Sequence, residues 1–188
     1  MHTNSAVSDV SSTTIQKFYK NETIPPWKTM MWQIEEGTVK TSTLAEDGNV
    51  IILGYWCPGE VVGHVLSNIQ PYFIECLTDV EMSLLPSTMW GQAADKIIQH
   101  QHQTLKLLTI VQQEPLSYRL WLLLLWLDDK FGCNVNQGRL IRLKVTHQSL
   151  ADTIHSTRVS VTRTLKQFEA EGKLIKKGHQ IFLSSRSD

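Results

Sequence analysis

The sequence predicts an α+β protein in three parts: an N-terminal β-roll, a long helix and a C-terminal winged helix-turn-helix. Short β-type segments separated by turns fill residues 15–87, and an apolar repeat of helical period follows over residues 88–113. Residues 114–188 contain two capped short helices and a hairpin pattern. Residues 1–14 are polar and rich in Ser and Thr, so we expect a flexible tail there.

The composition is ordinary for a soluble globular chain, with 41% hydrophobic and 19% charged residues among 188. The most apolar run, Leu120–Leu127, has eight residues, whereas about 20 are needed to span a bilayer. The first residues lack the basic start and apolar core of a signal peptide. We therefore expect a cytoplasmic protein without a membrane partner.

Three cysteines, Cys57, Cys76 and Cys133, lie far apart in the chain and form no CxxC pair. Their number and spacing fit neither a disulfide framework nor a zinc signature. We interpret them as buried or incidental thiols. Redox sensing is the alternative, because thiol reactivity depends on surroundings that the sequence does not show.

The histidines give no pattern typical of a metal site. His100 and His102 are two positions apart, and residues at that spacing do not share a face of a helix. His64 is interpreted as a packed or hydrogen-bonded side chain. No Ser/His/Asp set, carboxylate pair or phosphate-binding loop stands at a usable spacing, so we expect no catalytic residue, metal or cofactor, and hence no enzyme.

Six β-type segments predict a small antiparallel barrel or roll. Asp47-Gly48-Asn49, between two of them, is a hairpin signal, and Pro58-Gly59 marks another turn. The predicted segments are Met30–Ile34, Val39–Leu44, Val50–Trp56, Val61–Leu66, Phe73–Leu77 and Val80–Leu85.

A 4-3 repeat after Pro86 predicts a long amphipathic helix whose stripe requires a partner. Gln101 and Thr104 interrupt the stripe, as polar residues do where they set the register of paired helices. We interpret the partner as a second copy of the chain; packing of the stripe on its own roll is the alternative. The predicted homodimer interface consists of Trp90, Ala94, Ile97, Gln101, Thr104, Leu108 and Val111.

Glu114-Pro115 breaks this helix and begins another, since proline fits the first turn of a helix but not its interior. The second helix should run to about Phe131. Gly132 suits the left-handed residue that often ends a helix.

Residues 146–183 predict a helix-turn-helix with a wing. Thr146 can cap a helix over His147–Ile154, and Thr157 can cap a second helix that ends near Gly172. The segment Leu174–Leu183 then predicts two strands joined by a turn, which form the wing. On the second helix, the inward positions should be Val161, Leu165 and Phe168.

The outer face of this second helix carries the kinds of side chain that read double-stranded DNA. Arginine can donate two hydrogen bonds to guanine, valine can pack on a thymine methyl, and hydroxyls and lysines suit phosphates. Residues 139–188 hold ten basic and four acidic side chains, a net charge of +6 on a neutral chain, which fits a polyanion at this end. The predicted DNA-binding residues are Thr146, His147, Thr157, Arg158, Val159, Ser160, Thr162, Arg163, Lys166 and Lys177.

These motifs resemble the DNA-binding module of the cyclic-AMP receptor/fumarate-nitrate-reductase regulator (Crp/Fnr) family. The resemblance is carried by Thr146-His-Gln-Ser-Leu-Ala and by Ser156-Thr-Arg-Val-Ser-Val-Thr-Arg163, the latter most similar to the cyanobacterial global nitrogen regulator subgroup. Lys130-Phe131-Gly132 and Pro58-Gly59-Glu60-Val61-Val62-Gly63 extend it over nearly the whole chain from about Ile15. It implies a cyclic-nucleotide-binding-like roll, a long dimerisation helix and a wing that flanks DNA.

The chain departs from the family pattern at the effector site. Members that bind cyclic nucleotides carry Gly-Glu-Leu and a later Arg-Ser pair, where this chain has Gly63-His64-Val65 and Gln70. In the global nitrogen regulator subgroup, arginines line the pocket for 2-oxoglutarate. This chain also lacks arginine at the positions expected to match them. Without a guanidinium group, this candidate effector pocket (Gly63, His64, Val65 and Gln70) offers no strong partner to a carboxylate or phosphate.

These interpretations together predict a sequence-specific DNA-binding transcription regulator that acts as a homodimer on a palindromic site. Neither cyclic AMP nor 2-oxoglutarate is expected to be a tight effector. RNA polymerase is a further partner if the protein is an activator. The alternative is a sensor, in which an unidentified small molecule or a redox change in the roll controls DNA binding.

Overall fold

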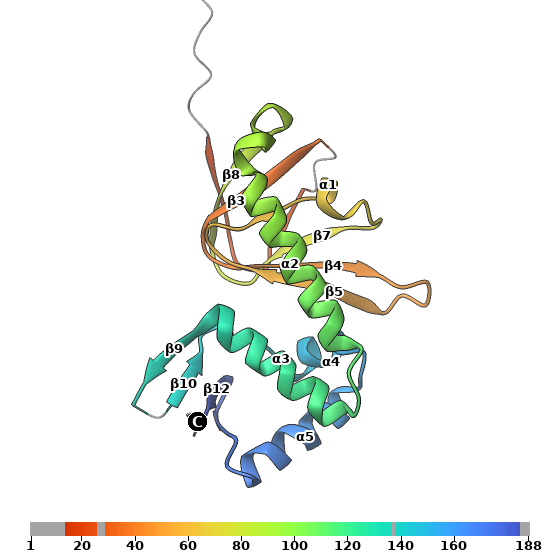
Figure 1. The fold of residues 1–188 in the computed structure, drawn as a ribbon, viewed down its shortest axis with the longest axis vertical. Coiled ribbons are helices and arrows are strands. Elements are labelled where there is room, and N and C mark those ends of the chain that lie inside the picture. The colour runs from red at the N-terminus through yellow and green to blue at the C-terminus, as the bar shows by residue number, and fades with distance from the viewer. Residues whose placement is uncertain (1–13, 26–28, 137, 185–188) are drawn as a thin grey trace, which may run out of the picture.

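The computed structural model describes residues 14–25, 29–136 and 138–184, so the predicted tail at 1–14 lies outside these ranges except for its last residue. Figure 1 shows the strands of the roll, then helix α2 (Ala94–Val111) along one side of the roll, then a smaller helical module with its own sheet. The observed architecture is the predicted α+β fold.

The roll consists of two antiparallel four-stranded sheets around an apolar core. Side chains that alternate along the strands point inward, and Trp32, Ile34, Ile74 and Cys76 are each at most 1% exposed. One sheet has the order β1 (Ile15–Phe18), β8 (Val80–Pro86), β3 (Met30–Glu36) and β6 (Val61–Val62); the other has the order β2 (Thr23–Ile24), β7 (Phe73–Cys76), β4 (Val39–Leu44) and β5 (Val50–Trp56).

The predicted strand Val61–Leu66 is wrong beyond its second residue. Only Val61 and Val62 pair with β3, and the chain then forms the one-turn helix α1 (His64–Ser67). A Cβ at Gly63 would stand 3.1 Å from the carbonyl oxygen of Met30, so glycine lets the chain pass close to β3 before it turns. Short apolar runs do not by themselves distinguish a strand from a helix.

Helix α2 begins later than predicted, because the 3-10 helix η1 (Ser87–Ala93) precedes it. Trp90 therefore lies before the α-helix. His100, Leu107 and Ile110 are the buried residues of α2.

The C-terminal module has the predicted helix-turn-helix and wing, and also two strands that the sequence did not predict. Its four-stranded sheet has the order β11 (Leu174–Lys177), β12 (Gln180–Leu183), β10 (Gly138–Ile141) and β9 (Gly132–Val135). The wing hairpin of β11 and β12 therefore pairs, through β12 and β10, with a second hairpin. The helices of the module are α3 (Leu116–Phe131), α4 (His147–Thr153) and α5 (Arg158–Ala170).

No helix of the described ranges is long and apolar enough to cross a membrane.

Gly132 follows α3 as predicted, but the predicted left-handed conformation is wrong. Its φ of −77° and ψ of 145° are extended, and it begins strand β9. The structure requires glycine here for a different reason: a Cβ would stand 2.2 Å from the carbonyl oxygen of Asp128. Close backbone approach, rather than a positive φ, explains this residue.

The roll and the module share one hydrophobic core. Ile52 and Tyr55 of β5 belong to the same cluster as Leu107 of α2 and Leu150 of α4. The phenol oxygen of Tyr55 also lies 3.0 Å from Oγ1 of Thr153 in α4. The module is therefore packed directly against the roll.

Candidate nucleic-acid interface

Both helices of the helix-turn-helix begin at the predicted caps. Oγ1 of Thr146 accepts a hydrogen bond from the backbone N–H of Ser149 at 3.0 Å, and Oγ1 of Thr157 accepts one from Ser160 at 3.1 Å. Each bond satisfies a first-turn N–H group that has no partner within its helix. In the turn between the helices, His155 adopts a left-handed φ of 51°.

Helix α5 divides into a buried face and an exposed face, as its pattern predicts. Val161, Leu165 and Phe168 are at most 3% exposed and pack in the shared core. The opposite face is open to solvent and includes Val159, which is 78% exposed. Of the predicted DNA-binding residues on this helix, Arg158, Val159, Arg163 and Lys166 are exposed, while Ser160 and Thr162 are half-buried.

His147 joins the two helices to the wing. Its Nδ1–H donates to Oγ1 of Thr162 at 2.8 Å, and its Nε2 accepts from the ammonium of Lys176 at 3.0 Å. Partial burial lowers the pKa of His147, and the charges of Lys176 and Arg158 lower it further. The neutral imidazole thus fixes the orientation of α4, α5 and β11. Lys176 was not among the predicted site residues, since no local pattern pairs it with a histidine 29 positions earlier.

The wing extends the basic surface beyond α5. Lys177 is exposed at the end of β11, and its ammonium lies 5.8 Å from the ring centroid of Phe182. Gly178 turns the hairpin with a φ of 60°. Two capped helices, an exposed basic helix face and a basic hairpin define a winged-helix DNA-binding protein.

Comparisons with known proteins agree with this class. The Crp-like helix-turn-helix domain matches residues 118–187. The regulatory protein CysR of Synechococcus elongatus is 34% identical over 154 residues, which cover 80% of this chain and 74% of that protein. The transcriptional regulator SdrP of Thermus thermophilus is 26% identical over 155 residues, 79% of this chain and 76% of that protein.

Among solved structures, the CRP-family transcriptional regulator TTHB099 of Thermus thermophilus has the same fold, with a TM-score of 0.77 at 24% identity over 90% of this chain and 92% of that chain. The chain belongs to the Crp/Fnr family of transcription regulators. It is therefore a DNA-binding regulator and not an enzyme.

The structure divides the predicted dimer stripe of α2 between two faces. Ile97 packs on the roll, Thr104 is half-buried and donates to the His100 carbonyl oxygen, and Val111 packs against the shared core. Trp90 donates its indole N–H to Leu85 within its own roll. The stripe residues that face solvent are Ala94, Gln101 and Leu108.

The exposed face of α2 carries an apolar row that shares Leu108 with the predicted stripe and adds Ile98 and Leu105. Ile98, Leu105 and Leu108 are 53%, 57% and 52% exposed. With Gln101 they follow a 3-4 spacing, which is the spacing of a helix that pairs with another helix.

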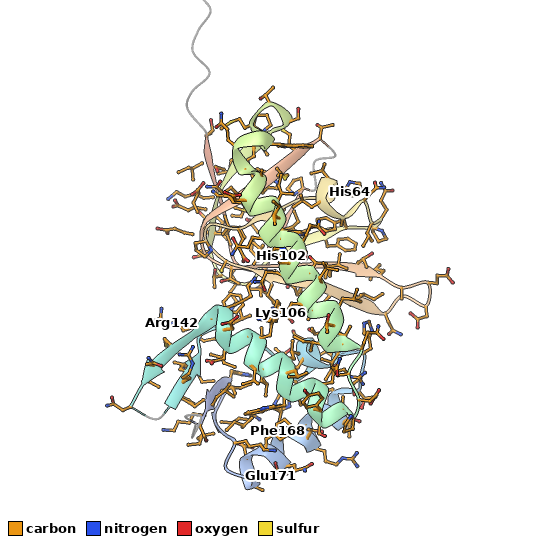
Figure 2. All side chains as sticks on the ribbon, viewed as in Figure 1. His64, His102, Lys106, Arg142, Phe168 and Glu171 are labelled. Atoms are coloured by element: carbon orange, nitrogen blue, oxygen red, sulfur yellow. The ribbon has the colours of Figure 1, made fainter. Side chains whose placement is uncertain are left out.

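The candidate effector residues lie together at α1, and within the described ranges no Lys or Arg side chain forms a hydrogen bond or ion pair with them. His64 is buried, and the amide of Gln70 donates to its Nε2 at 3.3 Å. Gly63 precedes α1 and Val65 packs against the roll. Figure 2 shows His64 away from His102, which lies on α2.

The interior of the roll beside α2 holds a cavity of about 190 Å³. Trp56 and His100 line it, and their rings stack with centroids 4.0 Å apart. The buried Tyr72 also lines the cavity, and its hydroxyl lies near the backbone of Gly63 and the side chain of Thr41. Within the described part of the chain, the lining contains no Lys, Arg, Asp or Glu and so offers no such charge to an ionic ligand. Its described residues are Thr41, Leu53, Trp56, Leu66, Ser67, Ile69, Tyr72, His100, Gln101 and Thr104.

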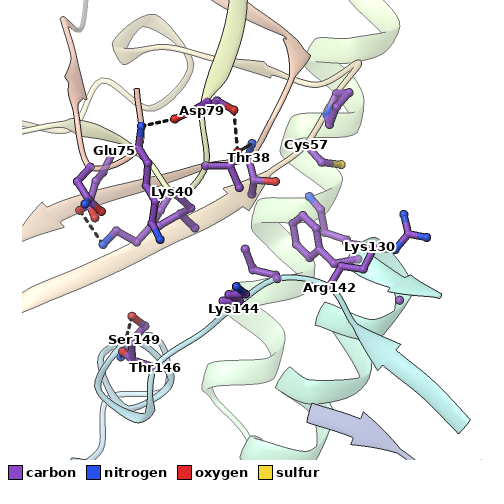
Figure 3. Close-up of a pocket in the computed structure, with 18 residues that line it drawn as sticks. Thr38, Lys40, Cys57, Glu75, Asp79, Lys130, Arg142, Lys144, Thr146 and Ser149 are labelled. Carbon is purple, nitrogen blue, oxygen red and sulfur yellow. Dashed lines mark hydrogen bonds and ion pairs between the residues drawn. The ribbon is translucent and has the colours of Figure 1, made fainter. Parts of the chain in front are cut away.

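A larger cleft of about 920 Å³ separates the roll from the segment that leads into α4 (Figure 3). Lys40 on its roll side forms an ion pair with Glu75 at 2.8 Å. Arg142 and Lys144, on the other side, are exposed. The cleft therefore separates part of the roll from part of the module, and the two pack against each other next to it.

Proposed function

We propose that the protein is a homodimeric, sequence-specific regulator that inserts α5 into the major groove of DNA. The observation that carries this proposal is the exposed face of α5, where Arg158, Val159 and Arg163 project from a helix anchored by its opposite face. Arginine suits guanine O6 and N7, and valine suits the methyl group of thymine. Thr146, Thr157, Ser160, Lys166 and Lys177 surround these side chains and fit contacts to phosphates and to the groove edge. His147 and Thr162 support this face from within the module, because their polar atoms are engaged with each other, with Lys176 and with the Arg158 carbonyl oxygen.

The exposed row Ile98, Leu105 and Leu108 of α2 supports the homodimer, because three large apolar side chains at coiled-coil spacing are left in solvent on one helix. A two-fold dimer presents its recognition helices about 34 Å apart, one turn of DNA. The DNA site is then a palindrome with two half-sites.

The likeness of Ser156–Arg163 to the nitrogen-regulator subgroup suggests a GTA-like half-site in an inverted repeat. Val159 stands where many family members carry a glutamate, which accepts a hydrogen bond from cytosine. Val159→Glu should therefore change the base preferred at one position of the half-site.

Neither cyclic AMP nor 2-oxoglutarate fits the small, uncharged cavity of the roll. Both ligands are anions, and a buried anion needs a cationic or strongly hydrogen-bonding partner. We expect isothermal titration calorimetry to detect no binding of either compound at micromolar concentration. A micromolar dissociation constant for either one contradicts this expectation.

A second candidate function, sensing of a small uncharged molecule, is favoured by the cavity beside Trp56, Tyr72 and His100, whose lining is aromatic, aliphatic and uncharged polar among the described residues. A thermal-shift screen of neutral aromatic compounds tests it. Redox sensing is less favoured at Cys57, because burial and the adjacent Glu60 carboxylate raise the pKa of its thiol to about 11.

A regulator of this kind acts in the bacterial cytoplasm, where the chromosome lies, and RNA polymerase is a partner if it activates transcription. Selection of bound sequences from random duplexes tests the DNA-reading role with wild type, Arg163→Ala and Val159→Glu. We expect an inverted repeat for the wild type and altered preferences at one base pair for each variant. Identical motifs from all three proteins contradict base reading by α5.

A further inference from the structure

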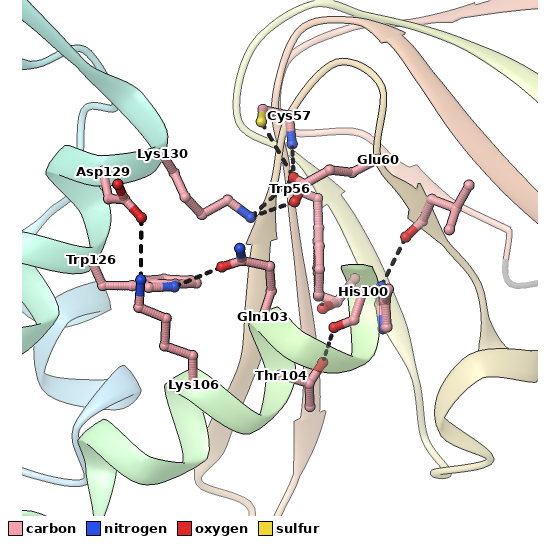
Figure 4. Close-up of polar contacts among 12 residues, drawn as sticks. Trp56, Cys57, Glu60, His100, Gln103, Thr104, Lys106, Trp126, Asp129 and Lys130 are labelled. Atoms are coloured by element: carbon pink, nitrogen blue, oxygen red, sulfur yellow. Dashed lines mark hydrogen bonds and ion pairs between the residues drawn. The ribbon is translucent and has the colours of Figure 1, made fainter. Parts of the chain in front are cut away.

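The three parts of the molecule meet around one buried ammonium group (Figure 4). Lys130, near the end of α3, places Nζ 2.8 and 3.0 Å from the two carboxylate oxygens of Glu60, in the turn after β5. The two side chains are only 5% and 7% exposed. The same carboxylate accepts hydrogen bonds from the backbone N–H and the thiol of Cys57. This ion pair is therefore desolvated and well satisfied, unlike an exposed surface pair.

Aromatic rings extend this junction to α2. The Lys130 ammonium lies 4.9 Å from the ring centroid of Trp56, whose ring also stacks on His100 of α2. Figure 4 shows Lys130 and His100 on opposite sides of the Trp56 ring. The ammonium also lies 5.4 Å from the ring of Trp126, whose N–H donates to Gln103 of α2 at 2.9 Å. A single cation thus contacts the roll and, through two indoles, the long helix.

The cleft of Figure 3 makes this contact important for the orientation of the module. The cleft opens between the roll and the segment before α4 (Figure 3), and beside it Tyr55 contacts Thr153 and Glu60 pairs with Lys130. Loss of the Glu60–Lys130 contact removes one restraint on the angle of the module, while the shared core and the Tyr55–Thr153 contact remain.

We propose that Lys130 is a positioning residue that fixes the angle of the DNA-binding module on the roll, and thereby the separation of the two recognition helices. The proposal rests on the homodimer proposed above. In such a dimer α2 joins the two rolls, so the distance between the α5 helices depends on how each module sits on its roll. A palindromic site demands one value of that distance.

Direct contact with DNA does not explain an effect of Lys130 on binding. Its side chain is 5% exposed and its ammonium is occupied by Glu60, so it cannot reach a phosphate. A change at Lys130 should leave the contacts of one module with one half-site intact. It should alter only the requirement for the correct spacing of two half-sites.

The main test variant is the double substitution Lys130→Met with Glu60→Gln, which removes both charges and keeps both shapes. Lys130→Met alone leaves a buried unpaired carboxylate, and such groups destabilise folds strongly. Glu60→Gln alone is a second variant, in which the amide oxygen still accepts from the ammonium. Lys106→Met is the matched control, because it removes an ion pair of the neighbouring α3 residue Asp129, at 3.2 Å, in which both side chains are more than half exposed.

Each protein is titrated with the selected inverted repeat, with the same repeat one base pair longer or shorter between half-sites, and with a single half-site. One base pair changes the separation by about 3.4 Å. Wild type and Lys106→Met should bind the original spacing best. The double variant should bind it about tenfold more weakly, discriminate poorly among spacings and bind the half-site as wild type does. Glu60→Gln should show a smaller change in the same direction.

Thermal melting shows which variants are folded. If a folded double variant keeps the wild-type spacing preference, Lys130 does not position the module; if the double variant does not fold, an unchanged preference in Glu60→Gln has the same meaning. A wild type that binds all spacings equally contradicts the homodimer instead. The two failures are therefore distinguishable.

Discussion

Val159 is an unusual residue for the surface of a basic helix. Its side chain is 78% exposed, more than any other large exposed hydrophobic side chain of the described residues, and it contributes nothing to the core. Its neighbour Arg158 and, one turn on, Arg163 are also exposed. An apolar side chain between two arginines suits a groove that presents methyl groups and guanine edges together.

At the scale of single residues, base-reading and phosphate-binding side chains should differ in their dependence on salt. Arg163→Ala should cost about 1–3 kcal/mol of binding free energy and relax discrimination at one base pair. Lys177→Ala, in the wing, should weaken binding to all sequences alike and lower the slope of log K against log salt by about one unit. Titrations at several KCl concentrations measure both effects. An unchanged slope for Lys177→Ala excludes a phosphate contact by this lysine.

At the scale of elements, α5 depends on the cap at its first turn. Thr157→Ala removes the acceptor of the Ser160 N–H and should lower the free energy of unfolding by about 1 kcal/mol. Thr157→Ser, which keeps the oxygen, is the control and should lose much less. Urea unfolding followed by circular dichroism measures the difference. Equal midpoints for Thr157→Ala and wild type would mean that the cap contributes nothing.

The two apolar faces of α2 explain why the sequence predicted a long amphipathic helix but not which of its residues face the roll. One face of α2 covers the roll and the other is exposed, and both faces carry apolar residues. A 4-3 repeat of apolar positions can therefore be fitted to either face. The predicted stripe combined Ile97, which packs on the roll, with the exposed Leu108. The phase of a helix is fixed by which side its neighbours cover, and this information lies elsewhere in the chain.

Charged substitutions on α2 should separate association from folding. Leu105→Glu combined with Leu108→Glu places charges on the exposed face and should yield folded monomers that bind the palindrome poorly. Ile97→Glu, on the roll-facing side, should instead lower the free energy of unfolding, because it buries a carboxylate against an apolar cluster. Equilibrium sedimentation and thermal melting measure the two effects. Wild type that sediments only as a monomer at micromolar concentration contradicts the homodimer.

At the scale of the whole molecule, the sequence predicted the three parts and missed how they join. Caps, turns and repeats are patterns of a few neighbouring residues, so Thr146, Thr157 and the wing could be located from sequence. Glu60 and Lys130 stand 70 positions apart, and Tyr55 and Thr153 stand 98 apart. Both Glu60 and Lys130 fell within motifs of the family resemblance, but no local pattern indicates that these two motifs meet.

The same junction gives the molecule a pH-dependent stability. Burial against Trp56 lowers the pKa of His100 from 6.5 to about 4, opposed in part by its hydrogen bond to the Val61 carbonyl. The nearby charges of Glu60 and Lys130 act in opposite directions. In the folded protein His100 therefore stays neutral at pH 5, whereas in the unfolded chain it is protonated.

Because the unfolded state binds the proton and the folded state does not, this contribution to stability is complete above pH 6.5 and decreases as the pH falls toward 4. Between pH 8 and pH 5, His100 alone should lower the free energy of unfolding by about 2 kcal/mol. His100→Asn keeps a donor for Val61 and does not titrate, so its unfolding free energy should fall by correspondingly less over this range. Urea titrations at the two pH values measure these differences, and equal losses in wild type and His100→Asn contradict a buried neutral imidazole.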